Sequence, residues 1–167
     1  FGRAQAHYEA AAQAARARRF QQMQTNALVG LASLALLRGD TASASELIRE
    51  GLPLSFEHMD RVMMGGYIRL GAWLASLQNQ PLRVAFLAGM NEALWRGLRA
   101  LDTVPDMWKG MDAALQSARA QLGETAFAQE YTRGQLLPLE EAVAFVLQSC
   151  LSPGSLYHPE TPFSSLT

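Results

Sequence analysis

Cysteine is almost absent from this chain of 167 residues, which contains Cys150 alone. A single thiol cannot form an internal disulfide, and the first residues lack the basic and then apolar pattern of a secretory signal. We therefore expect a reducing, cytoplasmic setting. The chain begins at Phe1 with residues that already fit a helix interior, so we also expect a segment of a longer protein.

Long apolar runs and runs of one charge are absent as well. Every apolar stretch is broken within a few positions by Arg, Gln, Glu or Gly, so none approaches the roughly 20 residues needed to cross a bilayer. Charged residues make up only 17% of the chain, and its 14 basic and 15 acidic residues are interspersed. No basic stripe is present to neutralise phosphates, so we expect no membrane span and no direct contact with nucleic acid.

The residues that usually carry catalysis or bind metals are few and scattered. His7, His58 and His158 fall in different segments with no ligands at the spacing of a metal site, and Cys150 has no neighbouring base. His58 and Asp60 form the single candidate pair, for which helix capping or a solvated contact is the expected role. The sequence predicts no catalytic residue, no metal site and no cofactor.

Helical periodicity is what the chain does contain. It is 49% hydrophobic, rich in Ala, Leu, Gln and Arg, and interrupted at Gly, Pro, Asp or Asn, where helices end most easily. This pattern predicts an all-α fold of about eight helices. Their expected ranges are Arg3 to Ala17, Gln22 to Arg38, Thr41 to Leu52, Asp60 to Gln78, Pro81 to Ala100, Pro105 to Leu122, Glu124 to Arg133 and Pro138 to Cys150.

Two of the expected turns share their chemistry. Gly39 and Asp40 supply a left-handed C-terminal residue and an N-cap, while Asn79 and Pro81 supply a left-handed residue and a proline suited to the first helical position. These signals predict antiparallel helix hairpins.

The two hairpins also share a sequence pattern at a shift of 40 positions. Ala32, Leu34, Ala35, Leu37 and Leu47 recur as Ala72, Leu74, Ala75, Leu77 and Leu87. This predicts a short solenoid made of helix pairs. An irregular bundle, in which alanine and leucine positions match by chance, stays open as the alternative.

Small and large residues recur at a fixed spacing within each pair, where Ala32 and Ala44 lie twelve positions apart, after Leu28 and before Ile48. This spacing resembles that of tetratricopeptide repeats (TPRs). The resemblance implies a right-handed, TPR-like solenoid of antiparallel helix pairs. The chain departs from the family where Leu28 and Ala35 replace the consensus Trp and Tyr, and where its spacing of 40 exceeds 34.

The stretch from Leu74 to Leu147 contains three motifs in order. They are Pro81-Leu-Arg-Val-Ala-Phe-Leu-Ala-Gly-Met-Asn-Glu-Ala-Leu, Ala118-Arg-Ala-Gln-Leu-Gly-Glu-Thr-Ala-Phe, and Leu137-Pro-Leu-Glu-Glu-Ala-Val-Ala. With these motifs the stretch resembles the end of the TPR-like region in MalT-like and LAL regulators, which are LuxR-type, ATPase-linked bacterial transcriptional activators. In those regulators a linker and a helix-turn-helix that opens with Leu-Thr come next, and this chain ends at Leu166-Thr167.

We therefore expect a TPR-like domain at residues 1–150 and a linker or tail at residues 151–167. The tail carries Pro153, Gly154, Pro159 and Pro162 among serines, which is the composition of a linker. Tyr157 and Phe163 leave open a tail that folds back onto the last helices.

The TPR resemblance also implies which residues line the inner curve of the solenoid. Carried over position by position, these are Asn26, Val29 and Ser33 in the first full pair and Gly66, Arg69, Trp73 and Ser76 in the next. Arg69 and Trp73 lie at i, i+4 and pair a cation with an aromatic plate, although Trp73 also fits an interhelical core.

Two functions remain open. The first is a non-catalytic ligand-sensing or protein-interaction segment of a LuxR-type regulator, without a DNA-binding domain of its own. Its expected partners are a small-molecule inducer or a protein, the neighbouring domains, and a second copy through self-association. The second is a stand-alone TPR-like adaptor that binds a peptide or a protein.

Overall fold

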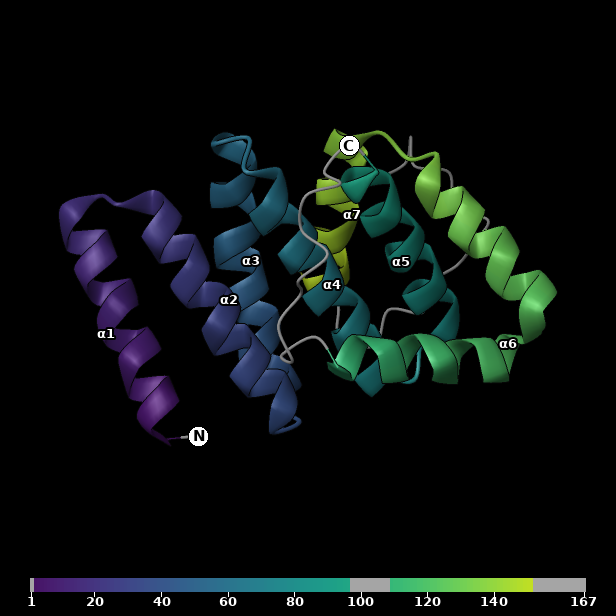
Figure 1. The fold of residues 1–167 in the computed structure, drawn as a ribbon, viewed down its shortest axis with the longest axis horizontal. Coiled ribbons are helices and arrows are strands. Elements are labelled where there is room, and N and C mark those ends of the chain that lie inside the picture. The colour runs from purple at the N-terminus through teal and green to yellow at the C-terminus, as the bar shows by residue number, and fades with distance from the viewer. Residues whose placement is uncertain (1, 97–108, 152–167) are drawn as a thin grey trace.

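All regular structure in the described residues, 2–96 and 109–151 of this computed structural model, is helical (Figure 1). The predicted all-α class is confirmed. The parts of the predicted helices at 97–100 and 105–108, and the predicted tail from 152 on with Tyr157 and Phe163, lie outside the described residues. The helices are α1 (Gly2–Arg18), α2 (Gln21–Leu37), α3 (Thr41–Glu57), α4 (Arg61–Leu77), α5 (Pro81–Trp95), α6 (Lys109–Gln135) and α7 (Leu139–Leu151).

The predicted end of α3 at Leu52 is wrong, because the helix continues through Pro53 to Glu57. Proline removes one backbone hydrogen-bond donor from the helix. Burial of side chains on either side of Pro53 stabilises the continued helix. Leu52 and Ser55 are both buried, and the Ser55 hydroxyl donates to the carbonyl of Leu52 at 2.7 Å.

The predicted break between the sixth and seventh helical segments is confirmed at Gly123. Its backbone angles, φ 75° and ψ 161°, interrupt α6 and divide it into two helical segments. In Figure 1 the first segment runs along one end of α4 and α5, and the second turns to run beside α5. Glycine suits this corner because it has no Cβ to oppose the positive φ.

Four consecutive turns have the same backbone structure. A residue with positive φ occurs at Arg19, Gly39, Met59 and Asn79, at a spacing of 20 residues. The next residue donates its N–H to the carbonyl five positions earlier. These bonds join Phe20 to Ala15, Asp40 to Ala35, and Asp60 to Ser55, each at 2.9 Å, and Gln80 to Ala75 at 3.0 Å. They are the hydrogen bonds of a Schellman C-cap, so the turns close the helices in the same way.

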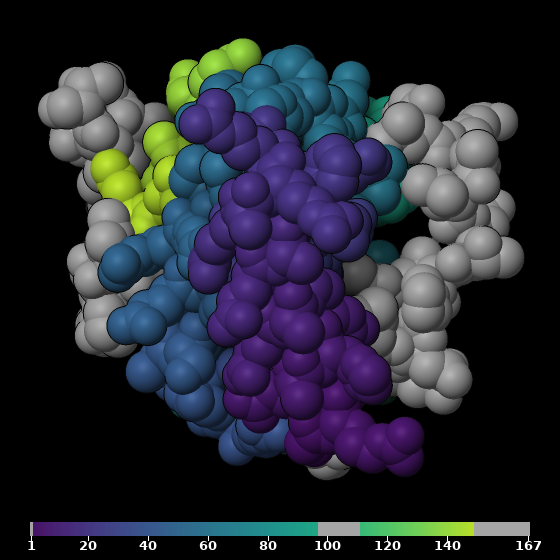
Figure 2. All heavy atoms as spheres, turned by 90° about the vertical axis from the view of Figure 1, so that its left-hand side faces the viewer, coloured from purple at the N-terminus to yellow at the C-terminus, as the bar shows by residue number. Residues whose placement is uncertain are grey.

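Helices adjacent in sequence pack together in an antiparallel arrangement from α1 to α6. In addition, α2 contacts α4, and α4 contacts α6. Figure 2, viewed from the end, shows α1 covering one end of the molecule, with α3 and α7 to one side of it.

Close helix contacts depend on glycine at several positions. The Tyr67 hydroxyl lies where a Cβ on Gly51 would lie, and it donates to the carbonyl of Thr25 at 2.8 Å. Gly89 and Gly134 let the backbones of α5 and α6 touch, since a Cβ on either would collide with a backbone carbonyl of the other helix.

The last helix does not pack mainly on its neighbour in sequence. Instead, α7 lies mainly on α3 and also contacts α4. Phe145 meets Phe86 of α5 edge to face, with ring centroids 4.8 Å apart. Among the described residues, no helix has both the length and the apolar content required to cross a bilayer.

Candidate functional site

The seven residues predicted to line an inner face do not form one open surface in the described structure. Val29, Ser33 and Trp73 are buried. The Ser33 hydroxyl donates to the carbonyl of Val29 at 2.8 Å, within its own helix. Trp73 is 8% exposed and belongs to the main hydrophobic core, so its ring offers little surface to a guest. Gly66 is buried too.

Arg69 and Ser76 lie on α4, near the first segment of α6. Burial lowers the pKa of the Arg69 guanidinium, and the charge of Asp112 on α6 opposes this effect. Ser76 lines a small crevice together with Ala114 and Ser117 of α6. The predicted groove beside Arg69 is therefore bordered by α6.

Asn26 is exposed and lines a cavity of 770 Å³. This cavity, which we call the end pocket, lies where the α1–α2 and α3–α4 turns meet. Two large apolar side chains on its wall are unusually exposed, Phe20 at 56% and Met23 at 49%. Its lining residues include Arg19, Phe20, Met23, Asn26, His58 and Asp60.

Two polar groups of the end pocket are already engaged in hydrogen bonds that stabilise the helices. Ser55, His58 and Asp60 all line it, but the Ser55 hydroxyl is occupied by the Leu52 carbonyl. The Asp60 carboxylate accepts from the backbone N–H of Met63 at 3.1 Å, so it caps α4 as the sequence predicted. No nucleophile and base are therefore assembled from these three groups.

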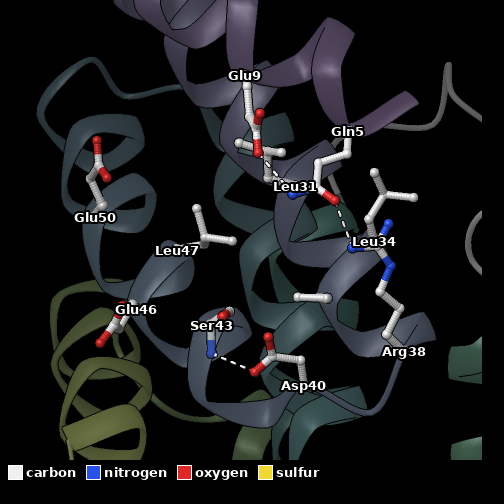
Figure 3. A pocket seen from close by; sticks show the side chains of 11 residues that line it. Gln5, Glu9, Leu31, Leu34, Arg38, Asp40, Ser43, Glu46, Leu47 and Glu50 are labelled. Carbon is white, nitrogen blue, oxygen red and sulfur yellow. Dashed lines mark hydrogen bonds between the residues drawn. The ribbon is translucent and has the colours of Figure 1, made fainter. Parts of the chain in front are cut away.

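A second hollow of 320 Å³ lies between α1 and α3, with α2 as its floor (Figure 3). We call it the acidic groove. Leu31, Leu34 and Leu47 provide its apolar part. Its charged residues are Glu9, Asp40, Glu46 and Glu50, with Arg38 as the single cation among the lining side chains.

Hydrogen bonds hold much of this rim in place. Gln5 donates to Glu9 at 2.8 Å and accepts from Arg38 at 2.6 Å. Hydrogen bonds from Ser43 lower the pKa of the Asp40 carboxyl, so it is ionised at neutral pH. Glu50 forms an ion pair with Arg16, which lies outside the lining.

Sequence reasoning missed both the end pocket and the acidic groove. Phe20 and Met23 carried a signal, because they place large apolar side chains next to a turn. The acidic rim was harder to find, since Glu9 and Glu46 are far apart in the sequence and line the same groove only because α1 and α3 pack on α2.

Among the described residues, no group of three or more His, Cys, Asp or Glu side chains is arranged to hold a metal ion. Comparison of the chain with family models, with curated proteins and with solved structures finds no match.

Proposed function

We propose that this chain is the non-catalytic ligand-sensing or protein-interaction segment of a LuxR-type transcriptional regulator, built from TPR-like helix pairs in a right-handed solenoid. The four equivalent turns support the helix-pair architecture, because identical caps at regular spacing stack successive hairpins in one way. The lone cysteine, Cys150, is compatible with the reducing, cytoplasmic setting that such a regulator needs.

The observation that carries the proposal is the end pocket. Its 770 Å³ falls within the range of about 300–1,000 Å³ that is typical of small-molecule sites. Phe20 and Met23 expose apolar surface that a guest would cover, while Asn26 and His58 offer polar contacts. A guest that prefers one curvature of the helix stack would shift its population and so act on neighbouring domains.

A thermal-shift screen of the whole chain against neutral sugars, small dicarboxylates and acidic peptides tests this role. At about one hundred times its Kd, a bound compound stabilises the fold by about 2.7 kcal/mol, which raises Tm by about 5–10 °C for a chain of this size. We expect one of these classes to produce such a shift.

Variants locate the bound compound. Phe20→Ser with Met23→Ser should weaken binding at least about tenfold, because the compound loses its apolar wall. The matched control is Leu37→Ser with Leu77→Ser, which changes two equally exposed apolar residues outside the pocket. A screen without any shift contradicts ligand sensing, and consumption of the compound contradicts a non-catalytic role.

The stand-alone adaptor is the second candidate, and the acidic groove favours it because its shape suits a peptide. The coding sequence beyond Thr167 separates the two. A helix-turn-helix there supports the regulator, whereas a stop codon favours the adaptor.

A further inference from the structure

The acidic groove has an equivalent 40 residues further along the chain. Its floor on α2 corresponds to α4, and its walls on α1 and α3 correspond to α3 and α5. Three positions define the match, since Leu31, Glu46 and Leu47 of the groove correspond to Gly71, Phe86 and Leu87.

The equivalent groove is occupied by a helix of the chain itself. A Cβ added to Gly71 would lie 3.4 Å from Val146 of α7 and 3.7 Å from Leu87. Phe145 of α7 packs on Phe86, and α7 also lies along α3. The groove formed by two parallel wall helices and the antiparallel floor helix between them thus accepts a helix.

The acidic groove differs from the occupied groove in charge, and its floor carries Leu31 where the occupied groove has Gly71. Glu46 stands where Phe86 meets α7, and Glu50 stands where the second groove has Met90. The apolar strip is retained through Leu31 and Leu34 on the α2 floor and Leu47 on the α3 wall. Four carboxylates border it, with Arg38 as the one cation beside them (Figure 3). The guest that complements this surface is amphipathic and basic.

We propose that the acidic groove binds one amphipathic helix of a partner protein, with apolar side chains on its buried face and lysines or arginines along its edges. This inference rests on the proposed binding role and adds the shape and charge of one guest. The α7 helix does not meet the requirement for charge, since its first turn carries Glu140 and Glu141. The floor helix α2 has 17 residues, about 25 Å, which is room for four to five helical turns.

The probe is a fluorescent peptide of about 18 residues made of Ala, Leu and Lys, with leucines at i, i+3, i+4 and i+7 and lysines beside them. Fluorescence anisotropy with the whole chain measures its Kd, which we expect in the micromolar range for one helix face. Glu46→Lys, at an exposed position, should weaken binding about tenfold or more, since it reverses one charge on the rim. Leu34→Ser should weaken binding to a similar extent, because it removes an apolar side chain from the floor.

The matched control is Glu57→Lys, which makes the same change at an exposed position of α3 outside the groove. Its Kd should stay within about twofold of wild type, and a peptide of residues 139–151 should not bind. Equal losses in Glu46→Lys and Glu57→Lys, or equal binding of a probe with alanine in place of leucine, would show attraction by charge alone and overturn the proposal.

Sedimentation velocity distinguishes a second copy of the chain from a partner helix. A dimer that Glu46→Lys converts to a monomer would mean that the groove is a self-association surface, and this overturns the proposal as stated. Failure of the probe leaves the compound shift at the end pocket unaffected, so failure of this inference is distinguishable from failure of the proposed function.

Discussion

Individual turn residues determine where each helix ends, and they do so at unequal cost. Gly39 adopts its positive φ without strain, whereas Arg19 and Met59 occupy the same left-handed conformation with a Cβ. The sequence predicted the left-handed residues Gly39 and Asn79, and both predictions are confirmed. Arg19 and Met59 could not be predicted in this way, because neither residue type favours that conformation.

Met59→Gly should therefore raise the free energy of unfolding by about 1 kcal/mol, since the penalty for an L-residue at positive φ is removed. Little burial is lost, because Met59 is 63% exposed. Urea denaturation measures the change. Gly39→Ala is the reverse experiment and should lower the free energy of unfolding by about 1 kcal/mol, the penalty for an L-residue at positive φ. No steric clash adds to this penalty, because no atom lies within 4 Å of the new Cβ. A loss of stability in Met59→Gly would contradict this account of the turns.

At the scale of single helices, the sequence predicted the features that depend on local pattern and missed those that depend on packing. Helix existence followed from periodicity, and the break at Gly123 followed from a glycine between two periodic segments. The continuation of α3 through Pro53 did not, because it depends on burial of Leu52 and Ser55 by other helices. The docking of α7 on α3 was equally hidden, since these helices are distant in sequence.

Gly134→Ala should destabilise the protein by about 2 kcal/mol or more, because a Cβ there would collide with the backbone carbonyl of Phe86. Gly71→Ala is the matched control, another buried helical glycine. Its Cβ would make only ordinary contacts at 3.4 and 3.7 Å, and alanine favours the helix by about 1 kcal/mol. Thermal and urea unfolding should show a loss for Gly134→Ala and none for Gly71→Ala. Equal effects would mean that the α5–α6 contact is not tight.

The molecule as a whole divides into two unlike parts. In α4–α7 the chain fills its own surfaces, since α6 borders Arg69 and Ser76 and α7 fills the groove over Gly71. In α1–α3 no described helix fills the corresponding groove, and the end pocket lies at the α1–α2 and α3–α4 turns. The sequence predicted a binding face shared by both parts because the inner positions were assigned from a regular solenoid. That assignment could not take account of α6 and α7, which come later in the chain and pack onto these surfaces.

The central claim is that guests bind on α1–α3, and amide hydrogen exchange of the whole chain tests it most directly. Exchange is measured with and without a saturating concentration of the lysine–leucine peptide. The account predicts slower exchange within residues 2–57, at the walls and floor of the acidic groove, and little change in residues 61–95 and 109–151. Protection concentrated in α4–α7, or no protection in α1–α3 with the peptide bound, would contradict it.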